Sequence, residues 1–195
     1  MKLLLIRHAE AVYGDTDGLT EVGTHQAQLL ADRLALGEVD HLYSSPMPRA
    51  TDTAGIISKY INLDATIEEE LREINPGSLP IYWDEEKKQW RDNLDRDEHL
   101  AIDFTGYGGE EPRGFHRHAS TILETIMERH VLEEKTVASV CHGAVINSVL
   151  YYFFGTELPV KLGFALDNAS VTAVRITRKG PTIEVVNDTS HLAVD

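Results

Sequence analysis

The chain of 195 residues is long enough for one domain with a substantial hydrophobic core. Hydrophobic residues make up 42% of it and charged residues 26%, values that are typical of a folded protein and that exclude disorder of the whole chain. Acidic residues outnumber basic ones 32 to 18, and the resulting net charge of −14 argues against nucleic acid or an anionic membrane as a partner.

The first third of the chain alternates between strand and helix patterns. The short run Lys2-Leu3-Leu4-Leu5-Ile6, which is continuously apolar from Leu3 on, is typical of a buried strand. Thr20 is a suitable N-cap residue for the first helix, and Gly37 ends that helix. The turn at Ser44-Ser45-Pro46 separates the second strand from the second helix. We expect strands at residues 2–6, 39–43 and 66–69, and helices between residues 20 and 37 and at about 47–60.

Residues 75–115 differ from the segments around them. Three prolines frame a strongly charged stretch that also contains both tryptophans, Trp83 and Trp90. We interpret this segment as an inserted helical cap over a pocket, in which the tryptophans pack in the cap or core rather than stack on a substrate. Its basic residues are expected to be solvated among their acidic neighbours rather than to bind a second acidic group of the substrate.

Regular patterning resumes after the insertion. Helices are expected at about residues 114–130 and 144–154, and strands at residues 136–141, 170–176 and 182–186. Alternating strands and helices favour a largely parallel sheet with helices on both faces. The predicted fold is therefore α/β, a three-layer αβα sandwich in a single domain over residues 1–195, with the cap insertion at about 75–115.

Cysteine content and the apolar runs indicate where the protein works. Cys141 is the only cysteine, so an intrachain disulfide is excluded. No run approaches the roughly 20 apolar residues of a membrane span, and the first apolar run is too short for the core of a signal peptide. We therefore expect a cytoplasmic protein. The sequence leaves the oligomeric state open, a homodimer included.

Charged and histidine side chains lie where predicted strands end or helices begin. They are Arg7 and His8 after the first strand, Arg49 after the second, Glu73 after the third, and His142 after the strand that ends at Cys141. Ligands bind at the carboxyl ends of parallel strands, so these side chains could converge. Arginine suits phosphate oxygens, an unprotonated histidine can act as a nucleophile, and a carboxylic acid can protonate a leaving group. The set indicates phosphoryl-transfer chemistry.

The motifs around these residues resemble those of the histidine phosphatase superfamily, and more narrowly its phosphoglycerate-mutase-like branch. The resemblance extends in order from Lys2 to about His191. It rests on the motifs Leu-Leu-Ile-Arg7-His8-Ala-Glu10, Leu19-Thr20-x-x-Gly23-x-x-Gln26-Ala27, Ser44-Ser45-Pro-x-x-Arg49-Ala50-x-x-Thr53-Ala54, Leu71-x-Glu73 and His142-Gly143. Any one of these pieces is a weak signal, whereas the ordered set is specific.

The resemblance implies a role for each residue of the set. His8 would be the phosphorylated nucleophile, and Glu73 would be the general acid and base. The phosphoryl oxygens would be held by Arg7, Arg49 and His142. The resemblance further implies a phosphomonoester phosphatase that works without a metal or another cofactor on a small phosphorylated metabolite.

The sequence allows two alternatives to a phosphatase. A phosphoglycerate mutase would need extra basic residues just after Glu73, and the sequence has Asn75 and Pro76 there, so hydrolysis is favoured. The other alternative is a non-catalytic module that binds a phosphorylated ligand. The presence of all five residues expected to carry the chemistry argues against it. Glu73 itself follows the acidic run at residues 68–70, so a solvated surface position is the alternative to its catalytic role.

Overall fold

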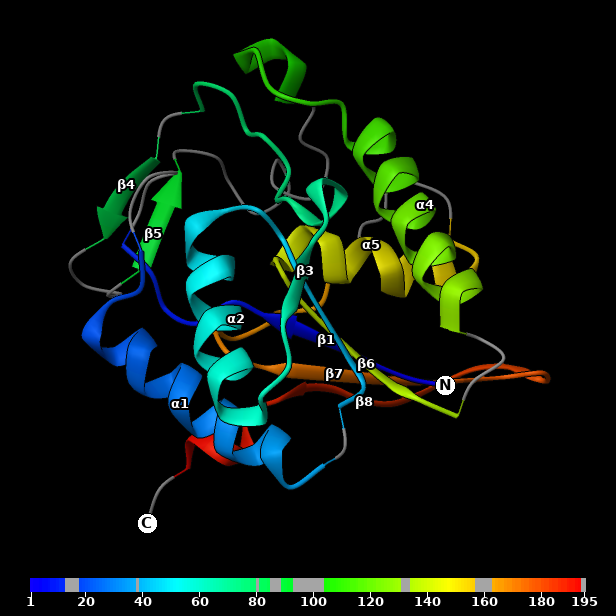
Figure 1. Cartoon of the computed structure of the whole chain (residues 1–195). Helices are drawn as coiled ribbons and strands as arrows, with labels where there is room; N and C mark the ends of the chain where they lie inside the picture. Colours follow the sequence, from blue (N-terminus) through cyan, green and yellow to red (C-terminus); the bar gives the residue numbers. More distant parts are fainter. Residues whose placement is uncertain are drawn as a thin grey trace.

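A mixed sheet lies at the centre of the computed structural model (Figure 1). The structure describes residues 1–12, 18–37, 39–79, 81–84, 89–92, 104–130, 134–156 and 163–193. Within these residues the sheet has the strand order β3-β2-β6-β1-β7-β8. Its strands are β1 (Lys2–Arg7), β2 (His41–Ser44), β3 (Ala65–Ile67), β6 (Thr136–Cys141), β7 (Val171–Thr177) and β8 (Gly180–Asp188).

The strands from β3 to β1 run parallel to one another. β2 pairs in parallel with both β3 and β6, and β6 pairs in parallel with β1. β7 is antiparallel to β1, and β8 is antiparallel to β7. The prediction of a largely parallel sheet is therefore confirmed, with an antiparallel pair added beside β1.

Helices cover both faces of the sheet (Figure 1). α1 (Glu21–Ala35) and α2 (Pro48–Ile61) pack on one face, and α4 (Pro112–His130) and α5 (Gly143–Phe154) pack on the other. Side chains of β1 alternate between the two cores, which explains why all four residues from Leu3 to Ile6 are apolar. The predicted three-layer αβα architecture is confirmed. None of the helices in the described residues combines the length and hydrophobicity that a membrane span requires.

Local sequence signals set the ends of the helices on the first face. Thr20 accepts a hydrogen bond from the Gly23 amide through Oγ1 at 2.9 Å, as an N-cap residue does. α2 has Pro48 at its start and is followed by Asn62 in the left-handed conformation, with φ of 53°. Gly23 packs so closely on Glu10 that an added methyl group would overlap the backbone carbonyl oxygen. This contact seats α1 beside the segment that follows β1.

The insertion differs from the predicted helical cap. Its described residues include β4 (Ile81–Asp84) and β5 (Gln89–Asp92), which pair as an antiparallel two-stranded sheet, and the short 3-10 helix η2 (Phe104–Tyr107). The prediction of helices was wrong for these residues, because aromatic and β-branched residues favour strands that can pair with each other. Residues 85–88 and 93–103, where the helical prediction also applied, lie outside the described residues.

The C-terminal end of the described chain returns to α1. The 3-10 helix η3 (Ser190–Leu192) follows β8 and lies against α1 (Figure 1). Arg33 of α1 donates a hydrogen bond through Nη2 to Asp188 Oδ2 at 2.5 Å, and its Nη1 lies 3.0 Å from His191 Nδ1. These contacts fix the end of the edge strand β8, and the 3-10 helix η3 after it, to helix α1.

Candidate active site

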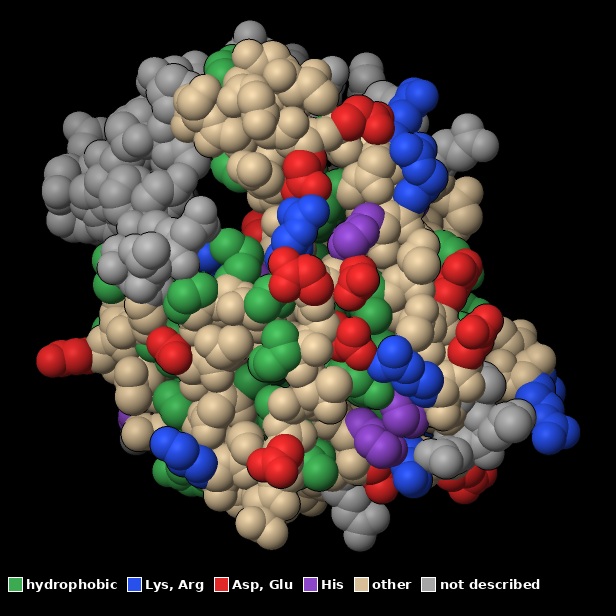
Figure 2. All heavy atoms as spheres, turned by 45° about the horizontal axis from the view of Figure 1, so that its top comes forward, with side chains coloured by type: hydrophobic (Ala, Val, Ile, Leu, Met, Phe, Trp, Pro, Cys, Tyr) green, Lys and Arg blue, Asp and Glu red, His purple; other side chains and the backbone are tan. Residues whose placement is uncertain are grey.

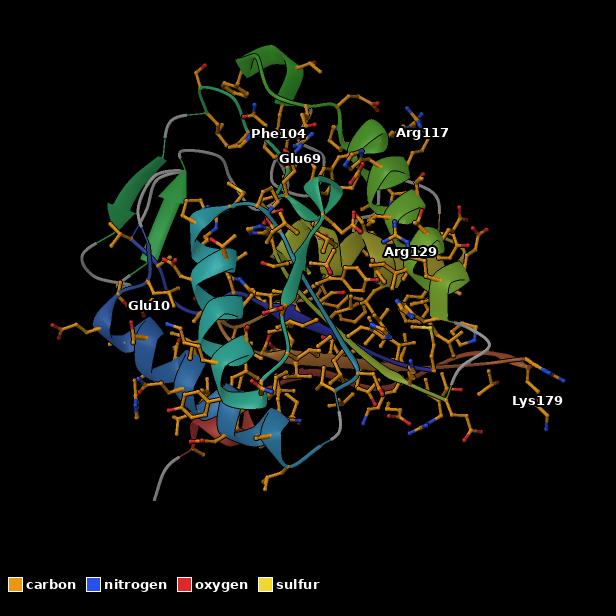
Figure 3. The ribbon with its side chains drawn as sticks, in the orientation of Figure 1. Glu10, Glu69, Phe104, Arg117, Arg129 and Lys179 are labelled. Atoms are coloured by element: carbon orange, nitrogen blue, oxygen red, sulfur yellow. The ribbon has the colours of Figure 1, made fainter. Side chains whose placement is uncertain are left out.

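The residues predicted to carry chemistry meet at the carboxyl end of the parallel strands. Arg7 is the last residue of β1 and His8 follows it, while His142 follows the last residue of the neighbouring strand β6. Figure 3 shows Glu10 near this end of the sheet and Lys179, on the turn between β7 and β8, at the opposite end. The parallel pairing thus brings distant segments to one edge, where open α/β sheets bind ligands.

His8 is a buried histidine with one ring nitrogen on a backbone carbonyl and the other on an arginine. Its Nδ1 lies 2.8 Å from the carbonyl oxygen of Ala9, which can only accept a hydrogen bond, so Nδ1 carries the proton. Its Nε2 is then unprotonated and accepts a hydrogen bond from Arg49 Nε at 3.2 Å. Burial above all lowers the pKa of His8 to about 3, assisted by the charges of Arg49 and Arg7. The ring is therefore neutral, with its lone pair at Nε2.

Hydrogen bonds from two other segments hold the backbone around His8. The carbonyl oxygen of His8 accepts from Asn168 Nδ2 at 3.1 Å. The hydroxyl of Thr53 accepts from the Ala9 amide at 3.1 Å and donates to the carbonyl oxygen of Arg49 at 2.7 Å. Because Thr53 lies on α2, one side chain links the loop that carries His8 to the helix turn that carries Arg49.

Two arginines supply the positive charge of the site. Arg49 lies in the first turn of α2, and Arg7 donates through Nη1 to the carbonyl oxygen of Leu166. The Nε of Arg7 is buried and makes no hydrogen bond within the part of the chain that the structure describes. Burial lowers the pKa of Arg7 and the Glu73 carboxylate opposes this, but an arginine stays charged. On the face shown in Figure 2, by contrast, basic side chains are interspersed with acidic ones.

His142 is fully buried and lies beside His8. The two ring centroids are 5.1 Å apart, and the rings are tilted by 56°. His142 Nε2 lies 2.8 Å from the hydroxyl oxygen of Ser45, which also accepts a hydrogen bond from the Met47 amide at 3.2 Å. Burial lowers the pKa of His142 to about 2, and Nδ1 makes no hydrogen bond to any described residue. A buried polar atom of this kind normally has a partner, so Nδ1 is available to a ligand.

Glu73 approaches this group from the segment after the 3-10 helix η1 (Glu69–Leu71). Its Oε1 accepts hydrogen bonds from the Ile74 amide at 3.1 Å and from the Ala144 amide at 3.2 Å. Ala144 lies in the first turn of α5, where backbone N–H groups favour a carboxylate. Burial nevertheless outweighs these hydrogen bonds and the charges of Arg49 and Arg7, and it raises the pKa of Glu73. The carboxyl group thus faces the site and holds a proton more readily than an exposed glutamate.

Two residues of the site lie in the quoted motifs, but no role was predicted for them. Ser45 contacts the ring of His142, and Thr53 links His8 to Arg49. Both hydroxyls contact residues far away in the sequence, His142 for Ser45 and Ala9 for Thr53. The one sequence signal for them is that each hydroxyl lies within four residues of Arg49. Cys141 is buried, and burial raises the pKa of its thiol, so the neutral thiol is a packing group here. Among the described residues, no three His, Cys, Asp or Glu side chains are grouped to hold a metal ion.

Known proteins share this sequence pattern and this fold. A family model described as "Histidine phosphatase superfamily (branch 1)" matches residues 3–189. Phosphoserine phosphatase 1 of Hydrogenobacter thermophilus is 29% identical over 204 residues, which cover 98% of this chain and 94% of that protein. A probable phosphoglycerate mutase, GpmB of Yersinia enterocolitica, is 28% identical over 214 residues, covering 98% and 95%. The crystal structure of phosphoserine phosphatase from Entamoeba histolytica in complex with 3-phosphoglyceric acid is 28% identical, covers 98% of both chains and superposes with a TM-score of 0.77.

Proposed function

This chain belongs to the histidine phosphatase superfamily, and we propose that it hydrolyses small phosphomonoesters through a phosphohistidine formed on His8. The observation that carries the proposal is the state of the His8 ring. Its proton is held at Nδ1 by Ala9, and its lone pair at Nε2 faces the guanidinium group of Arg49. A nucleophilic ring nitrogen whose lone pair carries no proton, next to a group that binds phosphate, is what phosphoryl transfer to a side chain requires.

The first proposed step is phosphorylation of His8. The lone pair of Nε2 attacks phosphorus, a P–N bond forms, and the bond between phosphorus and the ester oxygen breaks. The leaving oxygen takes the proton of the Glu73 carboxyl group, whose pKa is raised by burial. The products of this step are the free alcohol, phosphohistidine at residue 8 and a Glu73 carboxylate.

The second proposed step is hydrolysis of the phosphohistidine. The Glu73 carboxylate removes a proton from a water molecule, whose oxygen attacks phosphorus while the P–N bond breaks. Inorganic phosphate leaves, the lone pair returns to Nε2, and Glu73 is protonated again. Because Glu73 accepts hydrogen bonds from backbone amides at the start of α5, its ionised form is also stabilised between the two steps.

Arg7, Arg49 and His142 are proposed to bind the non-bridging phosphoryl oxygens in both steps. Arg7 Nε and His142 Nδ1 support this assignment, since both are buried and lack a hydrogen bond within the described residues. A doubly charged phosphate opposes the effect of burial on His142, so the bound anion favours a proton on this ring. Catalysis then rests on positioning and on electrostatic stabilisation of the transferring group by the chain's own side chains.

Hydrolysis is favoured over the mutase reaction by the residues that follow Glu73. Asn75 and Pro76 carry no charge that could hold the second acidic group of a phosphoglycerate during transfer. Phosphoserine is the first substrate to test, because the relatives include a phosphoserine phosphatase over nearly the whole chain. The cytoplasmic location and the single domain over residues 1–195 stay predictions, and the oligomeric state, a homodimer included, stays open.

The test is an assay of released phosphate in the presence of EDTA. Phosphoserine, p-nitrophenyl phosphate and a panel of phosphorylated metabolites are incubated with the protein at mildly acidic to neutral pH. We expect phosphate release from at least one of them. No release by a folded protein would instead support the non-catalytic binding module, and isomerisation of 3-phosphoglycerate in the presence of 2,3-bisphosphoglycerate, without phosphate release, would support the mutase.

A further inference from the structure

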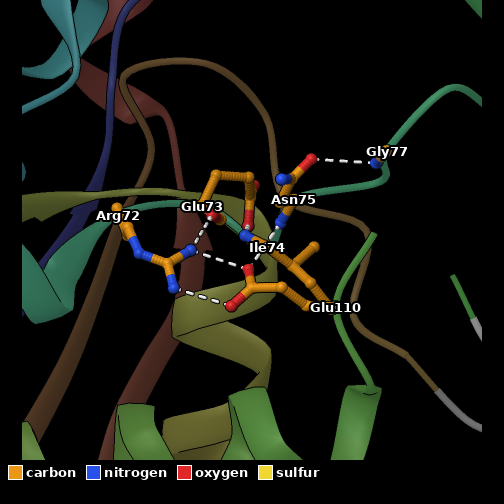
Figure 4. Close-up of polar contacts among 6 residues, drawn as sticks. All are labelled: Arg72, Glu73, Ile74, Asn75, Gly77 and Glu110. Carbon is orange, nitrogen blue, oxygen red and sulfur yellow. Dashed lines mark hydrogen bonds and ion pairs between the residues drawn. The ribbon is translucent and has the colours of Figure 1, made fainter. Parts of the chain in front are cut away.

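A bidentate ion pair joins the residue before Glu73 to the segment that leads into α4 (Figure 4). Arg72 donates through Nη1 and Nη2 to the two carboxylate oxygens of Glu110, each at 2.6 Å. The two residues are 38 positions apart. Arg72 lies just before the insertion and Glu110 lies near its end, so the ion pair joins the two ends of the insertion. Paired N–H···O bonds of this kind fix the relative orientation of the two groups as well as their distance.

Glu110 also holds the backbone on the other side of Glu73. Its Oε2 accepts a hydrogen bond from the Asn75 amide at 2.7 Å, and its own amide donates to the carbonyl oxygen of Asn75 at 2.9 Å. Arg72 Nη1 donates in addition to the carbonyl oxygen of Glu73 at 3.3 Å. Glu73 therefore lies between two residues that are both fixed to Glu110.

Next to this ion pair, the backbone at Gly77 packs closely against the backbone at Gly109. Gly77 has φ of +63°, and its amide donates to Asn75 Oδ1 at 2.8 Å. A methyl group on either Gly77 or Gly109 would overlap the backbone of the other segment. Ser78 donates to the carbonyl oxygen of Tyr107 through both its amide, at 2.8 Å, and its hydroxyl, at 3.0 Å. The two ends of the insertion are thus built to meet at one place, directly beside the Arg72–Glu110 pair.

The orientation of the Glu73 carboxyl group depends on this backbone. Its hydrogen bonds come from the amides of Ile74 and Ala144, one in its own segment and one in α5. Its reach toward the start of α5 is therefore set by where residues 72–75 lie. A displacement of about 1 Å is enough to disturb catalysis by such a group.

We propose that Arg72 and Glu110 are positioning residues that hold Glu73 in place as the proton donor, and that they link its position to the described ends of the insertion, residues 75–79 and 104–109. The inference rests on the proposed function, since it concerns the acid of that reaction. The hydrogen bonds from Arg72 lower the pKa of Glu110, so this carboxylate stays ionised to a lower pH than an exposed glutamate does.

The test compares Glu110→Gln with Glu184→Gln. The control removes a carboxylate of similar exposure that accepts from Arg175 Nε at 2.6 Å, on the strands β7 and β8 remote from the site. The kinetic readout is kcat/KM for an alkyl phosphate and for p-nitrophenyl phosphate, because kcat/KM includes only the steps up to departure of the leaving group. A second readout is the amide NMR signal of Ala144, which reports its hydrogen bond to Glu73 without any turnover.

Loss of positioning predicts a selective effect. In Glu110→Gln, kcat/KM should fall about tenfold or more for the alkyl phosphate and much less for the activated aryl ester, which needs little proton donation. The Ala144 signal should shift, and the reversed pair Arg72→Glu/Glu110→Arg should recover part of the alkyl phosphate activity. Glu184→Gln should behave as the wild-type protein in both readouts.

Two results would overturn the inference. One is an equal change on both esters in Glu110→Gln together with an unshifted Ala144 signal. The other is wild-type kinetics in that variant. If Glu110→Gln unfolds, Arg72→Lys replaces it, since lysine keeps the charge but not the paired hydrogen bonds. Failure of the proposed function looks different, because then the wild-type protein itself would release no phosphate.

Discussion

Arg49 donates a hydrogen bond from Nε to Nε2 of His8 at 3.2 Å, on the ring nitrogen that carries no proton. The opposite nitrogen, Nδ1, is held by the carbonyl oxygen of Ala9 at 2.8 Å. A phosphoryl group bound by this guanidinium is therefore brought to the nucleophilic atom of His8. Because Arg49 lies in the first turn of a helix and His8 directly follows a strand, the folded core fixes the relation between the two side chains, and little must be ordered when substrate binds.

Replacement of Glu73 by glutamine should reduce kcat/KM by an amount that depends on the leaving group of the ester. Glutamine keeps the size of the side chain but cannot donate the proton that a poor leaving group needs. We expect kcat/KM for an alkyl phosphate to fall by about 100-fold or more, and that for p-nitrophenyl phosphate to fall far less. Glu69→Gln, at an exposed position four residues earlier, is the matched control. Equal losses on both esters would show that Glu73 is not the acid.

The leaving-group proton also predicts a pH dependence. Burial raises the pKa of Glu73, so its carboxyl group stays protonated to a higher pH than an exposed glutamate does. With alkyl phosphates, kcat/KM should decline as the pH rises through that pKa, because the acid is then lost. This declining limb should be absent from the profile of Glu73→Gln. An unchanged limb in the variant would assign it to the substrate or to another residue.

Replacement of Ser45 by alanine should disturb His142 without touching the nucleophile. The buried Nε2 of His142 would lose its partner, which costs about 1–3 kcal/mol in the free energy of unfolding. Inhibition by vanadate, a phosphate analogue, should weaken because the ring is no longer held. Ser44→Ala is the control, since the neighbouring buried hydroxyl donates only to the carbonyl oxygen of Ser45. Equal vanadate inhibition in the two variants would contradict the role of Ser45.

The buried, neutral histidines should make the fold less stable in acid. The pKa of His8 is lowered to about 3, so between that value and about 6.5 the unfolded chain binds a proton that the native protein does not. Stability is then fully present above about pH 6.5 and is lost as the pH falls. Denaturant titrations should show that the free energy of unfolding of wild type falls more steeply below pH 6.5 than that of His8→Gln, by about 1.4 kcal/mol per pH unit. His25→Gln, at an exposed position of α1, is the control, and identical slopes for wild type and His8→Gln would refute the assignment.

Two glycine substitutions in the first helical layer should have opposite effects. At Gly23 a methyl group would overlap the carbonyl oxygen of Glu10, so Gly23→Ala should lower the free energy of unfolding by about 1–3 kcal/mol. Gly55 lies inside α2 with open space around it, so Gly55→Ala should raise the free energy of unfolding by up to about 1 kcal/mol. Urea denaturation measures both. A neutral Gly23→Ala variant would mean that α1 can move away from the active-site loop.

Much of this architecture is predictable because its signals are local. The strand at residues 2–6 and the N-cap at Thr20 follow from hydrophobic pattern and side-chain type, and the structure has β1 and α1 there. The convergence of Arg7, His8 and His142 follows from the rule that parallel strands end at one edge. The order of the elements along the chain and their local sequence patterns are therefore enough to predict the hydrophobic core and the centre of the site.

Features that depend on contacts between distant residues were not predictable in the same way. Residues 81–84 and 89–92 of the insertion pair as the strands β4 and β5, and the charged composition of the insertion hides the pattern that pairing requires. Ser45 reaches His142 across 97 positions, and Glu110 reaches Arg72 across 38. Nothing near Ser45 or Glu110 in the sequence indicates which partner the fold will bring to it, because those contacts exist only after the sheet has assembled.

The most direct test of the central claim is to trap the phosphoryl group on the protein. The enzyme is mixed with radiolabelled substrate for less than one turnover, quenched in alkali, digested and analysed by mass spectrometry. We predict that the label is found on residue 8 as an acid-labile phosphohistidine, and that His8→Ala carries no label and releases no phosphate while still binding vanadate. Label on any other residue, or continued hydrolysis by His8→Ala, would contradict the account.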